Sequence, residues 1–391
     1  MDISPATQEF IKEHRQDDVR QLALKAHVYP EVDMLTAITQ IAGRQAVAAK
    51  IPSWHQVDEL QYPVHLSLEQ CSSEVTARYK ASLLKGDSLV DLTGGFGVDC
   101  AFMAKNFRQV TYVERQEELC EIAEHNFVQL GLSNISVFHK DSVSFLREMN
   151  EAGCIFIDPA RRSRHGRKII KISDCEPNVE ELETVLLEKG KEIMIKLSPM
   201  LDLSQALQSL TAVGEVHVVS VRNECKELLL LLRSEKPGNT PIHCINIDSN
   251  GEKQAFIFTV KEEADATCIY TNDINRYLYE PNASLLKAGA FKSIGARYSL
   301  KKLHPNSHLY TSDELVERFP GRKFLVLADS LGKMEKGLFP NLQKANVATR
   351  NYPLAANDLR KKLNVSDGGD IYLFGTTLSN NKKVVIKCEK L

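Results

Sequence analysis

Hydrophobic residues change their spacing about eighty residues into the chain. Over residues 1–85 they recur at helical intervals, and prolines at positions 30, 52 and 63 interrupt the pattern. From Ser88 to Ser234, short apolar runs alternate with longer amphipathic stretches. The first pattern predicts a helical amino-terminal domain, and the second predicts strands that alternate with helices. The apolar positions in this region include Leu22, Leu24, Ala26 and Leu35, Ile38, Ile41.

Seven of the apolar runs have the length and composition of strands. Helical stretches between them require crossover connections, which predicts a mostly parallel sheet covered on both faces. Only three residues, Glu224 to Lys226, separate the last two runs, so we expect a hairpin and antiparallel pairing at the sheet edge. Further hairpins are expected around residues 249–251 and at Asn380-Asn381. The runs are SLVDLTG, VTYVER, ISVFHK, CIFIDPA, EIMIKLSP, EVHVVSVRN and KELLLLLRS.

The composition is 43% apolar and 26% charged over 391 residues, which is typical of a soluble globular protein of two or three domains. No apolar run approaches the ~18 residues that span a bilayer, and the start MDISPATQEFIKEHRQDD lacks an apolar leader. We therefore expect a cytoplasmic protein without membrane contact. Nine single cysteines predict no metal site. The net charge is −2, but residues 281–302 contain no acid and the last fifty are net basic.

A glycine-rich turn, SLVDLTGGFGVDCAFMA, is the strongest local signal. A strand is expected to end at Asp91 and a helix to begin near Val98. Glycines let the backbone approach a ligand closely, and the first turn of a helix offers unpaired N–H groups. The turn therefore predicts binding of NAD or of S-adenosylmethionine, unless it is a turn without a ligand. The predicted contacts are Asp91, Thr93, Gly94, Gly95, Phe96 and Gly97.

Two residues of this turn distinguish the two ligands. The dinucleotide fingerprint requires a third glycine, where this chain has Cys100. Asp91 would repel a pyrophosphate, whereas S-adenosylmethionine has no phosphate and presents an ammonium and a sulfonium. The sequence therefore favours S-adenosylmethionine over NAD.

Two more acidic residues end the next two predicted strands. Glu114 can accept hydrogen bonds from two ribose hydroxyls, and Arg115 follows it. Asp141, with Ser142 beside it, can accept from an adenine amino group, although either acid alone is also a plausible helix N-cap. Because open parallel sheets bind ligands at the carboxyl ends of their strands, Asp91, Glu114 and Asp141 together indicate one site.

These motifs resemble those of a known family. VDLTGGFGVD, Glu114, Asp141 and FIDPAR together resemble class I S-adenosylmethionine-dependent methyltransferases. The resemblance implies a Rossmann-like, seven-stranded α/β sheet whose seventh strand is reversed. LEQCSSEVTARYKA, YLYEPNASLLKAGAF and the tail resemble bacterial methyltransferases with a ferredoxin-like segment and a THUMP-like domain. The implied domains are helical (1–85), methyltransferase (86–273), ferredoxin-like (274–320) and THUMP-like (321–391).

The fourth strand ends in Asp158-Pro159, and amino-group methyltransferases of this class have D/N-P-P-Y/F/W here. In that motif a carboxylate or amide and a backbone carbonyl hold the acceptor nitrogen. Ala160 and Arg161 do not match; Arg161 can stack on a base or bind phosphate. We take Asp158, Pro159 and Arg161 as the catalytic candidates. The alternative is that Asp158 caps local N–H groups and that residues 161–171 form a solvated basic loop.

D-P-A-R also resembles the motif of RNA uracil-C5 methyltransferases. That chemistry needs a cysteine nucleophile just after the fifth strand. The corresponding stretch, IMIKLSPMLD, offers Lys196 and Ser198 but no cysteine, which argues against this mechanism. Lys196 is either a residue at the edge of the core or a substrate contact.

The leading hypothesis is a methyltransferase that acts on RNA at a base nitrogen. It combines the predicted cofactor site, Asp158-Pro159 and basic segments in a region that resembles an RNA-binding module. The alternatives are a methyltransferase for a small molecule or a protein side chain, a non-catalytic RNA-binding protein, and NAD-dependent redox chemistry.

Overall fold

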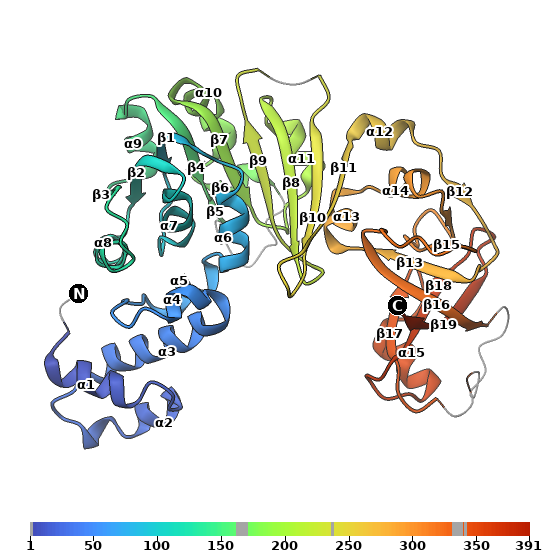
Figure 1. Cartoon of the computed structure of the whole chain (residues 1–391), viewed down its shortest axis with the longest axis horizontal. Coiled ribbons are helices and arrows are strands. Elements are labelled where there is room, and N and C mark those ends of the chain that lie inside the picture. Colours follow the sequence, from blue (N-terminus) through green and yellow to red (C-terminus); the bar gives the residue numbers. More distant parts are fainter. Residues whose placement is uncertain (1–2, 162–170, 236–237, 331–338, 340–341) are drawn as a thin grey trace. The chain divides into compact units, whose positions relative to one another are not determined.

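The computed structural model describes residues 3–161, 171–235, 238–330, 339 and 342–391. Contacts within the chain divide it into two compact units (Figure 1). Unit 1 comprises Met1–Val216 and Lys226–Pro237, and unit 2 comprises His217–Cys225 and Gly238–Leu391. No helix in the described ranges is long and apolar enough to cross a membrane.

Unit 1 begins with helices, as the sequence predicts. Capping side chains fix several helix starts: Ser4 accepts from the N–H of Thr7, and Asp33 from that of Thr36. Phe10, Leu22, Ala37 and Ile41 form a small core, whereas Leu24 and Leu35 are exposed. The helices are α1 (Pro5–Glu13), α2 (Val19–Leu24), α3 (Met34–Lys50), α4 (Pro52–His55), α5 (His65–Gln70) and α6 (Glu74–Ala81).

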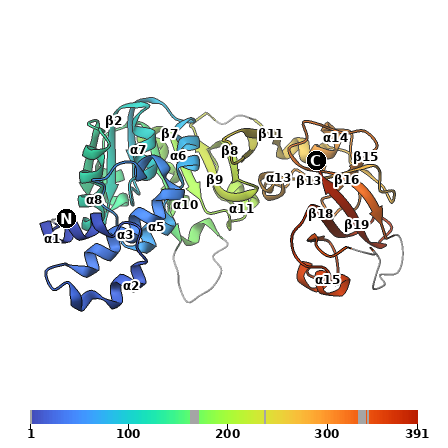
Figure 2. The same ribbon diagram turned by 60° about the horizontal axis from the view of Figure 1, so that its bottom comes forward.

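A nine-stranded sheet follows, in the order β11-β10-β8-β9-β7-β4-β1-β2-β3. The strands β7, β4, β1, β2 and β3 run parallel, so their carboxyl ends share one edge. Helices α7 (Val98–Ala104), α8 (Glu117–Gln129), α9 (Ser142–Glu148) and α10 (Val179–Lys189) connect them (Figure 1). Figure 2 shows α7, α8 and α10 from another side. The parallel strands are β1 (Gly86–Asp91), β2 (Phe107–Glu114), β3 (Ile135–His139), β4 (Ala152–Ile157) and β7 (Gly190–Leu197).

Helix α11 (Leu203–Ser209) leads from β7 into β8 (Val213–Val221), and β9 (Glu224–Leu232) returns antiparallel beside β7. This reversed strand, inserted between its two predecessors, confirms the expected class I methyltransferase sheet. The predicted three-residue connection was wrong. Two residues, Arg222 and Asn223, form the turn, both at positive φ (52° and 63°). This geometry matches the right-handed strand twist in a two-residue hairpin, so Glu224 and Cys225 join the strand.

The hairpin expected around residues 249–251 is confirmed as β10 (Pro241–Ile247) and β11 (Lys253–Thr259). Unit 2 also holds an eight-stranded sheet in the order β12-β14-β15-β13-β16-β19-β18-β17, around Leu278, Phe324, Phe374 and Ile386. Its strands are β12 (Ile269–Tyr270), β13 (Tyr277–Pro281), β14 (Lys301–Lys302), β15 (Tyr310–Ser312), β16 (Gly321–Asp329), β17 (Asn346–Arg350), β18 (Ile371–Thr377) and β19 (Lys383–Lys390).

The described part of unit 2 also contains the helices α12 (Val260–Asp265), α13 (Ala283–Ala288), α14 (Ser293–Arg297) and α15 (Ala356–Leu363). Strands β18 and β19 pair antiparallel, with Asn381 at φ 64° in their connection, which confirms the hairpin predicted at Asn380-Asn381. Asparagine tolerates this left-handed conformation better than most residues, which is why the Asn-Asn pair was informative.

Candidate functional site

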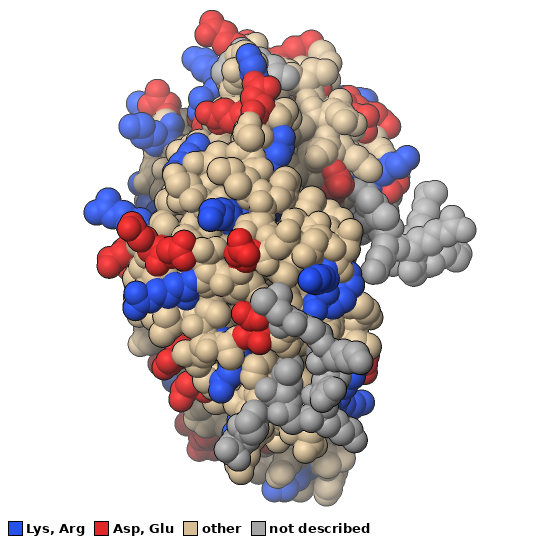
Figure 3. Space-filling view, turned by 90° about the vertical axis from the view of Figure 1, so that its right-hand side faces the viewer, with Lys and Arg blue, Asp and Glu red and all other residues tan. Residues whose placement is uncertain are grey.

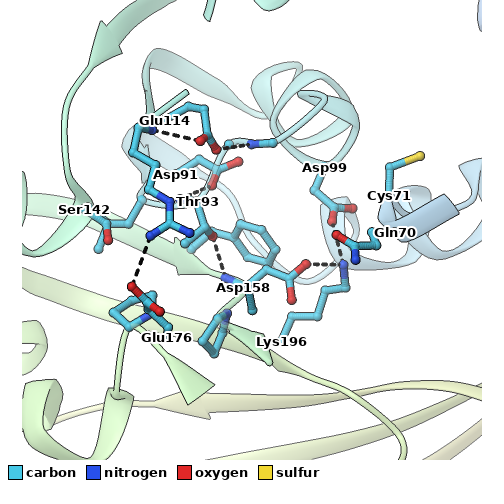
Figure 4. A pocket seen from close by; sticks show the side chains of 18 of the residues that line it. Gln70, Cys71, Asp91, Thr93, Asp99, Glu114, Ser142, Asp158, Glu176 and Lys196 are labelled. Carbon is cyan, nitrogen blue, oxygen red and sulfur yellow. Dashed lines mark hydrogen bonds and ion pairs between the residues drawn. The ribbon is translucent and has the colours of Figure 1, made fainter. Parts of the chain in front are cut away.

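A cavity of about 1260 Å³ lies in unit 1 at the carboxyl ends of the parallel strands (Figure 4). Five neighbouring strands in the order β7-β4-β1-β2-β3 each contribute a charged residue at or just beyond this edge. These residues are Lys196, Asp158, Asp91, Glu114 and Asp141, and all five line the cavity. The acidic residues that the sequence singled out therefore surround one space.

The glycine turn has little room for side chains. A Cβ at Gly94 would lie 2.1 Å from Cε2 of Tyr112, and Gly95 and Gly97 have φ of +55° and +82°. The Tyr112 hydroxyl donates to the Gly95 carbonyl at 2.5 Å, which holds the turn. Phe96 is 3% exposed and packs on Trp54, so its ring mainly supports the turn from the protein side.

Asp91 is 1% exposed, and its Oδ1 accepts the Thr93 N–H at 3.0 Å. Burial raises the pKa of Asp91 well above its usual value, and the nearby carboxylates of Asp99, Asp158 and Glu114 raise it further. A bound ammonium group would oppose both effects. The site therefore fits S-adenosylmethionine, whose ammonium supplies the missing positive charge.

Substituting Asp91→Asn is expected to weaken S-adenosylmethionine binding about 10–100-fold, because a charge-assisted hydrogen bond is lost. The same change should raise the melting temperature of the ligand-free protein by about 2–4 °C. Burial raises the pKa of Asp91 in the folded state, so ionising it costs stability as the pH rises through that pKa. Calorimetry and thermal unfolding measure the two effects. Asp87→Asn, on the exposed start of β1, is the control; equal cofactor affinity in both variants would contradict the role of Asp91.

Backbone N–H groups fix the carboxylate of Glu114. Its Oε2 accepts from Gly95 at 3.0 Å, and its Oε1 accepts from Arg115 and Gln116 at 2.9 Å each. Oε2, with one donor, retains a lone pair for a ribose hydroxyl, whereas Oε1 already accepts two hydrogen bonds. The Arg115 side chain instead extends to Glu176, with Nη1 at 3.1 Å from Oε1. Glu114 is thus preorganised, as its predicted role requires.

The position of Asp141 is compatible with both of its predicted roles, a cofactor contact and a helix N-cap. Its Oδ1 accepts the Ser144 N–H at 2.9 Å and caps α9, and the residue also lines the cavity beside Ser142. The strand before it ends at His139, two residues earlier than the sequence indicated. Contact with an adenine amino group stays a prediction.

At the other end of the cavity, the backbone N–H of Asp158 donates to Thr93 Oγ1 at 2.6 Å, and Pro159 lines the wall. The carboxylate itself faces Lys196, with Oδ2 at 2.5 Å from Nζ. Ala160–Arg161 form β5, which pairs with β6 (Cys175–Glu176). The Arg161 side chain and the basic run at 162–170 lie outside the described residues, so their predicted roles stay predictions.

Sequence reasoning missed a charged cluster beside Asp158. Lys196 Nζ lies 2.5 Å from Asp158 Oδ2 and 3.4 Å from Asp99 Oδ2. Asp99 also pairs with the fully buried Lys80, whose Nζ lies 2.7 Å from Glu227 Oε2. We call this group, completed by Ser72, the lysine–carboxylate cluster. Its members are Ser72, Lys80, Asp99, Asp158, Lys196 and Glu227.

Lys196 is the one member of this cluster besides Asp158 that the sequence analysis singles out, as a substrate contact or a residue at the edge of the core. Ser72 donates to Asp99 at 2.7 Å, while its neighbour Ser73 caps α6. Lys80 and Glu227 gave no signal, because a lysine on a helix and a glutamate on a strand normally face solvent.

Family profiles match the carboxyl-terminal region. Residues 277–320 match a ferredoxin-like domain, and residues 322–390 match a THUMP domain-like family. These matches cover β13 to β15 and β16 to β19, respectively.

Two further comparisons include the amino-terminal and central parts of the chain. The crystal structure of a candidate methyltransferase from Porphyromonas gingivalis W83 shares 37% identity, covers 98% of this chain and 97% of its own, and superimposes with a TM-score of 0.89. An uncharacterised S-adenosylmethionine-dependent methyltransferase of Mycobacterium tuberculosis is 23% identical over 259 residues, which are 66% of this chain and 68% of that protein. When bound, S-adenosylmethionine supplies an electrophilic methyl group on sulfur. The chain belongs to the S-adenosylmethionine-dependent methyltransferases with ferredoxin-like and THUMP-like domains at the carboxyl terminus.

Proposed function

We propose that this enzyme transfers the methyl group of S-adenosylmethionine to RNA. The observation that carries the proposal is the THUMP-like match over residues 322–390, a region that resembles an RNA-binding module. That region contains thirteen lysines and arginines against six aspartates and glutamates. Lys361 and Lys362 of α15 are exposed there. Such side chains suit a phosphate backbone.

The cavity supports a second substrate beside the methyl donor. Pockets for one small ligand typically measure about 300–1000 Å³, and this cavity is larger. Asp158 lies at one end, with its side chain 34% exposed, so an acceptor group can reach it from solvent. A substrate as large as RNA needs to insert only the reacting part of one nucleotide.

On the face shown in Figure 3, lysines and arginines are interspersed with acidic side chains. RNA bound through such a surface would use a few discrete cationic contacts. Each contact to a single-stranded phosphate contributes about −0.7 to the slope of log affinity against log salt. We therefore propose a moderate salt dependence. The acceptor that Asp158-Pro159 predicts is a base nitrogen, and this finer assignment stays a prediction.

A transfer assay tests the proposed function. The protein is incubated with labelled S-adenosylmethionine and total RNA from cells that lack it, and label is expected in RNA. Filter binding at rising salt should show RNA affinity that falls with a slope set by a few phosphate contacts. Label in protein or small molecules only would instead support the alternative substrates. Binding of RNA without any transfer would support a non-catalytic RNA-binding protein.

A further inference from the structure

Two groups of opposite charge meet where the acceptor must sit. In Figure 4 the Asp158 carboxylate and the Lys196 ammonium face each other across one end of the cavity. Their atoms are 2.5 Å apart, and Lys196 also lies 3.1 Å from Ser72 Oγ. The Lys196 side chain is 12% exposed and Asp158 is 34% exposed, so both are accessible from the cavity. An acceptor that reaches Asp158 therefore also meets Lys196.

Lys196 acts as a cationic donor at this point. Burial alone would lower the pKa of Lys196, but the carboxylates of Asp158 and Asp99 outweigh burial and raise it above its usual value. A protonated lysine offers three N–H donors and no lone pair. It cannot take a proton from the acceptor. Its donors face Asp158, Asp99 and Ser72, so an acceptor lone pair that approaches Lys196 replaces one of these partners. The base in the pair is Asp158.

A hydroxyl group matches this donor and acceptor pair. It can donate its hydrogen to Asp158, accept from Lys196 with one lone pair, and direct the second lone pair at the methyl carbon. An amino nitrogen has only one lone pair. The Lys196 ammonium would compete for the pair that must attack. The geometry around Asp158 and Lys196 thus favours oxygen over the base nitrogen that the sequence motif predicts.

We propose that the acceptor is the ribose 2′-hydroxyl of RNA, with Asp158 and Lys196 as catalytic residues; this inference rests on the proposed function. The hydroxyl oxygen forms the new O–CH₃ bond while the bond from the methyl carbon to sulfur breaks. Its electron pair stays on sulfur, which becomes a neutral thioether. The hydroxyl proton passes to Asp158 and then to solvent. Lys196 stabilises the negative charge that develops on oxygen.

Among the described residues, the cavity wall offers no open aromatic ring on which a flipped base could stack. A flipped base normally stacks between aromatic or apolar faces. Among the described lining residues, the aromatic side chains are Phe96 and Phe156, and they are only 3% and 1% exposed. They belong to the core and offer no open ring face beside Asp158. A 2′-hydroxyl needs no such surface, because it projects from the backbone.

The experiment maps the product made by the wild-type, full-length protein. RNA labelled with the methyl group of S-adenosylmethionine is hydrolysed in alkali. Alkali cleaves RNA through the free 2′-hydroxyl, so a 2′-O-methylated position survives as a labelled dinucleotide, whereas a methylated base appears in a mononucleotide. Labelled dinucleotides are the expected result. Labelled mononucleotides would overturn this inference and leave the proposed function standing, while RNA without label would contradict both.

Variants of Lys196 test its part. Lys196→Met should lower the transfer rate by at least about 100-fold, the usual cost of removing a donor to a developing oxyanion. Lys196→Arg should retain more activity, because it keeps a cationic donor. Calorimetry should show that both variants bind S-adenosylmethionine with an affinity within about threefold of that of the wild type. Lys191→Met, on the exposed start of the same strand, is the matched control. Equal transfer rates in Lys196→Met and wild type would overturn the role of Lys196; product mapping needs no variant to fold.

Discussion

Replacing Asp158 with asparagine is expected to lower the rate of methyl transfer to RNA by about 10²–10⁴-fold, the usual contribution of a general base. Asparagine keeps the shape and the acceptor oxygen of aspartate but cannot take the acceptor proton. The fold should tolerate the change, because the backbone N–H of residue 158 makes the bond to Thr93 and because Lys196 keeps the Asp99 carboxylate as a counter-ion. S-adenosylmethionine affinity should stay within about threefold. Single-turnover rates and calorimetry on the same preparation separate the two effects.

Asp87→Asn is the matched control for this prediction, because Asp87 is an exposed aspartate outside the cavity. It should change neither the transfer rate nor the cofactor affinity. Unchanged turnover in Asp158→Asn would remove Asp158 from the mechanism. A parallel loss of cofactor affinity would instead mean that Asp158 belongs to the methyl-donor site, which would contradict its assignment to the acceptor.

The cofactor half of the site was predictable because its signals are local. The chain reaches from Asp91 through the glycine turn to Val98 within eight residues, and one strand, one turn and one helix start fix the geometry. Glu114 was found by the same logic, since it ends the next parallel strand. Neighbouring strand ends converge on one edge whatever the rest of the chain does.

The acceptor half was less predictable because its geometry depends on register between strands. Ile157 pairs with Ile195 across β4 and β7, which places Asp158 beside Lys196. Both residues were identified from the sequence, but a shift of one position in the pairing would have sent Lys196 to the opposite face of the sheet. The consequence is chemical, since a lysine beside Asp158 changes which acceptor atom the site favours.

The pairing of Lys80 with Glu227 could not be predicted from the sequence. They lie 147 residues apart, and both are buried, against the normal preference of their side chains. No spacing rule along one strand or helix relates them. Leu24 and Leu35 show the reverse, since these apolar side chains lie on helices but face solvent. Periodicity identifies helices better than it identifies which residues they bury.

The lysine–carboxylate cluster should be essential for stability as well as for placing Lys196. Lys80 is fully buried between Glu227 and Asp99, so Lys80→Met would leave two buried carboxylates without their main counter-ion. Removing one partner of a buried ion pair typically costs about 3–5 kcal/mol. Urea unfolding should show a loss of that size, whereas Lys85→Met, on an exposed neighbour, should stay within about 0.5 kcal/mol of wild type.

The pH dependence of that loss identifies its cause. Burial raises the pKa of Glu227, and Lys80 opposes the rise. Without Lys80, the pKa of Glu227 in the folded state should rise further. A carboxyl group whose pKa is higher in the folded than in the unfolded state stabilises the fold at low pH, and this stabilisation is lost as the pH rises through the folded-state pKa. The deficit of Lys80→Met should therefore shrink as the pH falls from about 8 to about 5. Adding Glu227→Gln should recover part of it at the higher pH. A deficit independent of pH would mean that lost packing around the lysine stem, and not the uncompensated carboxylates, destabilises the variant.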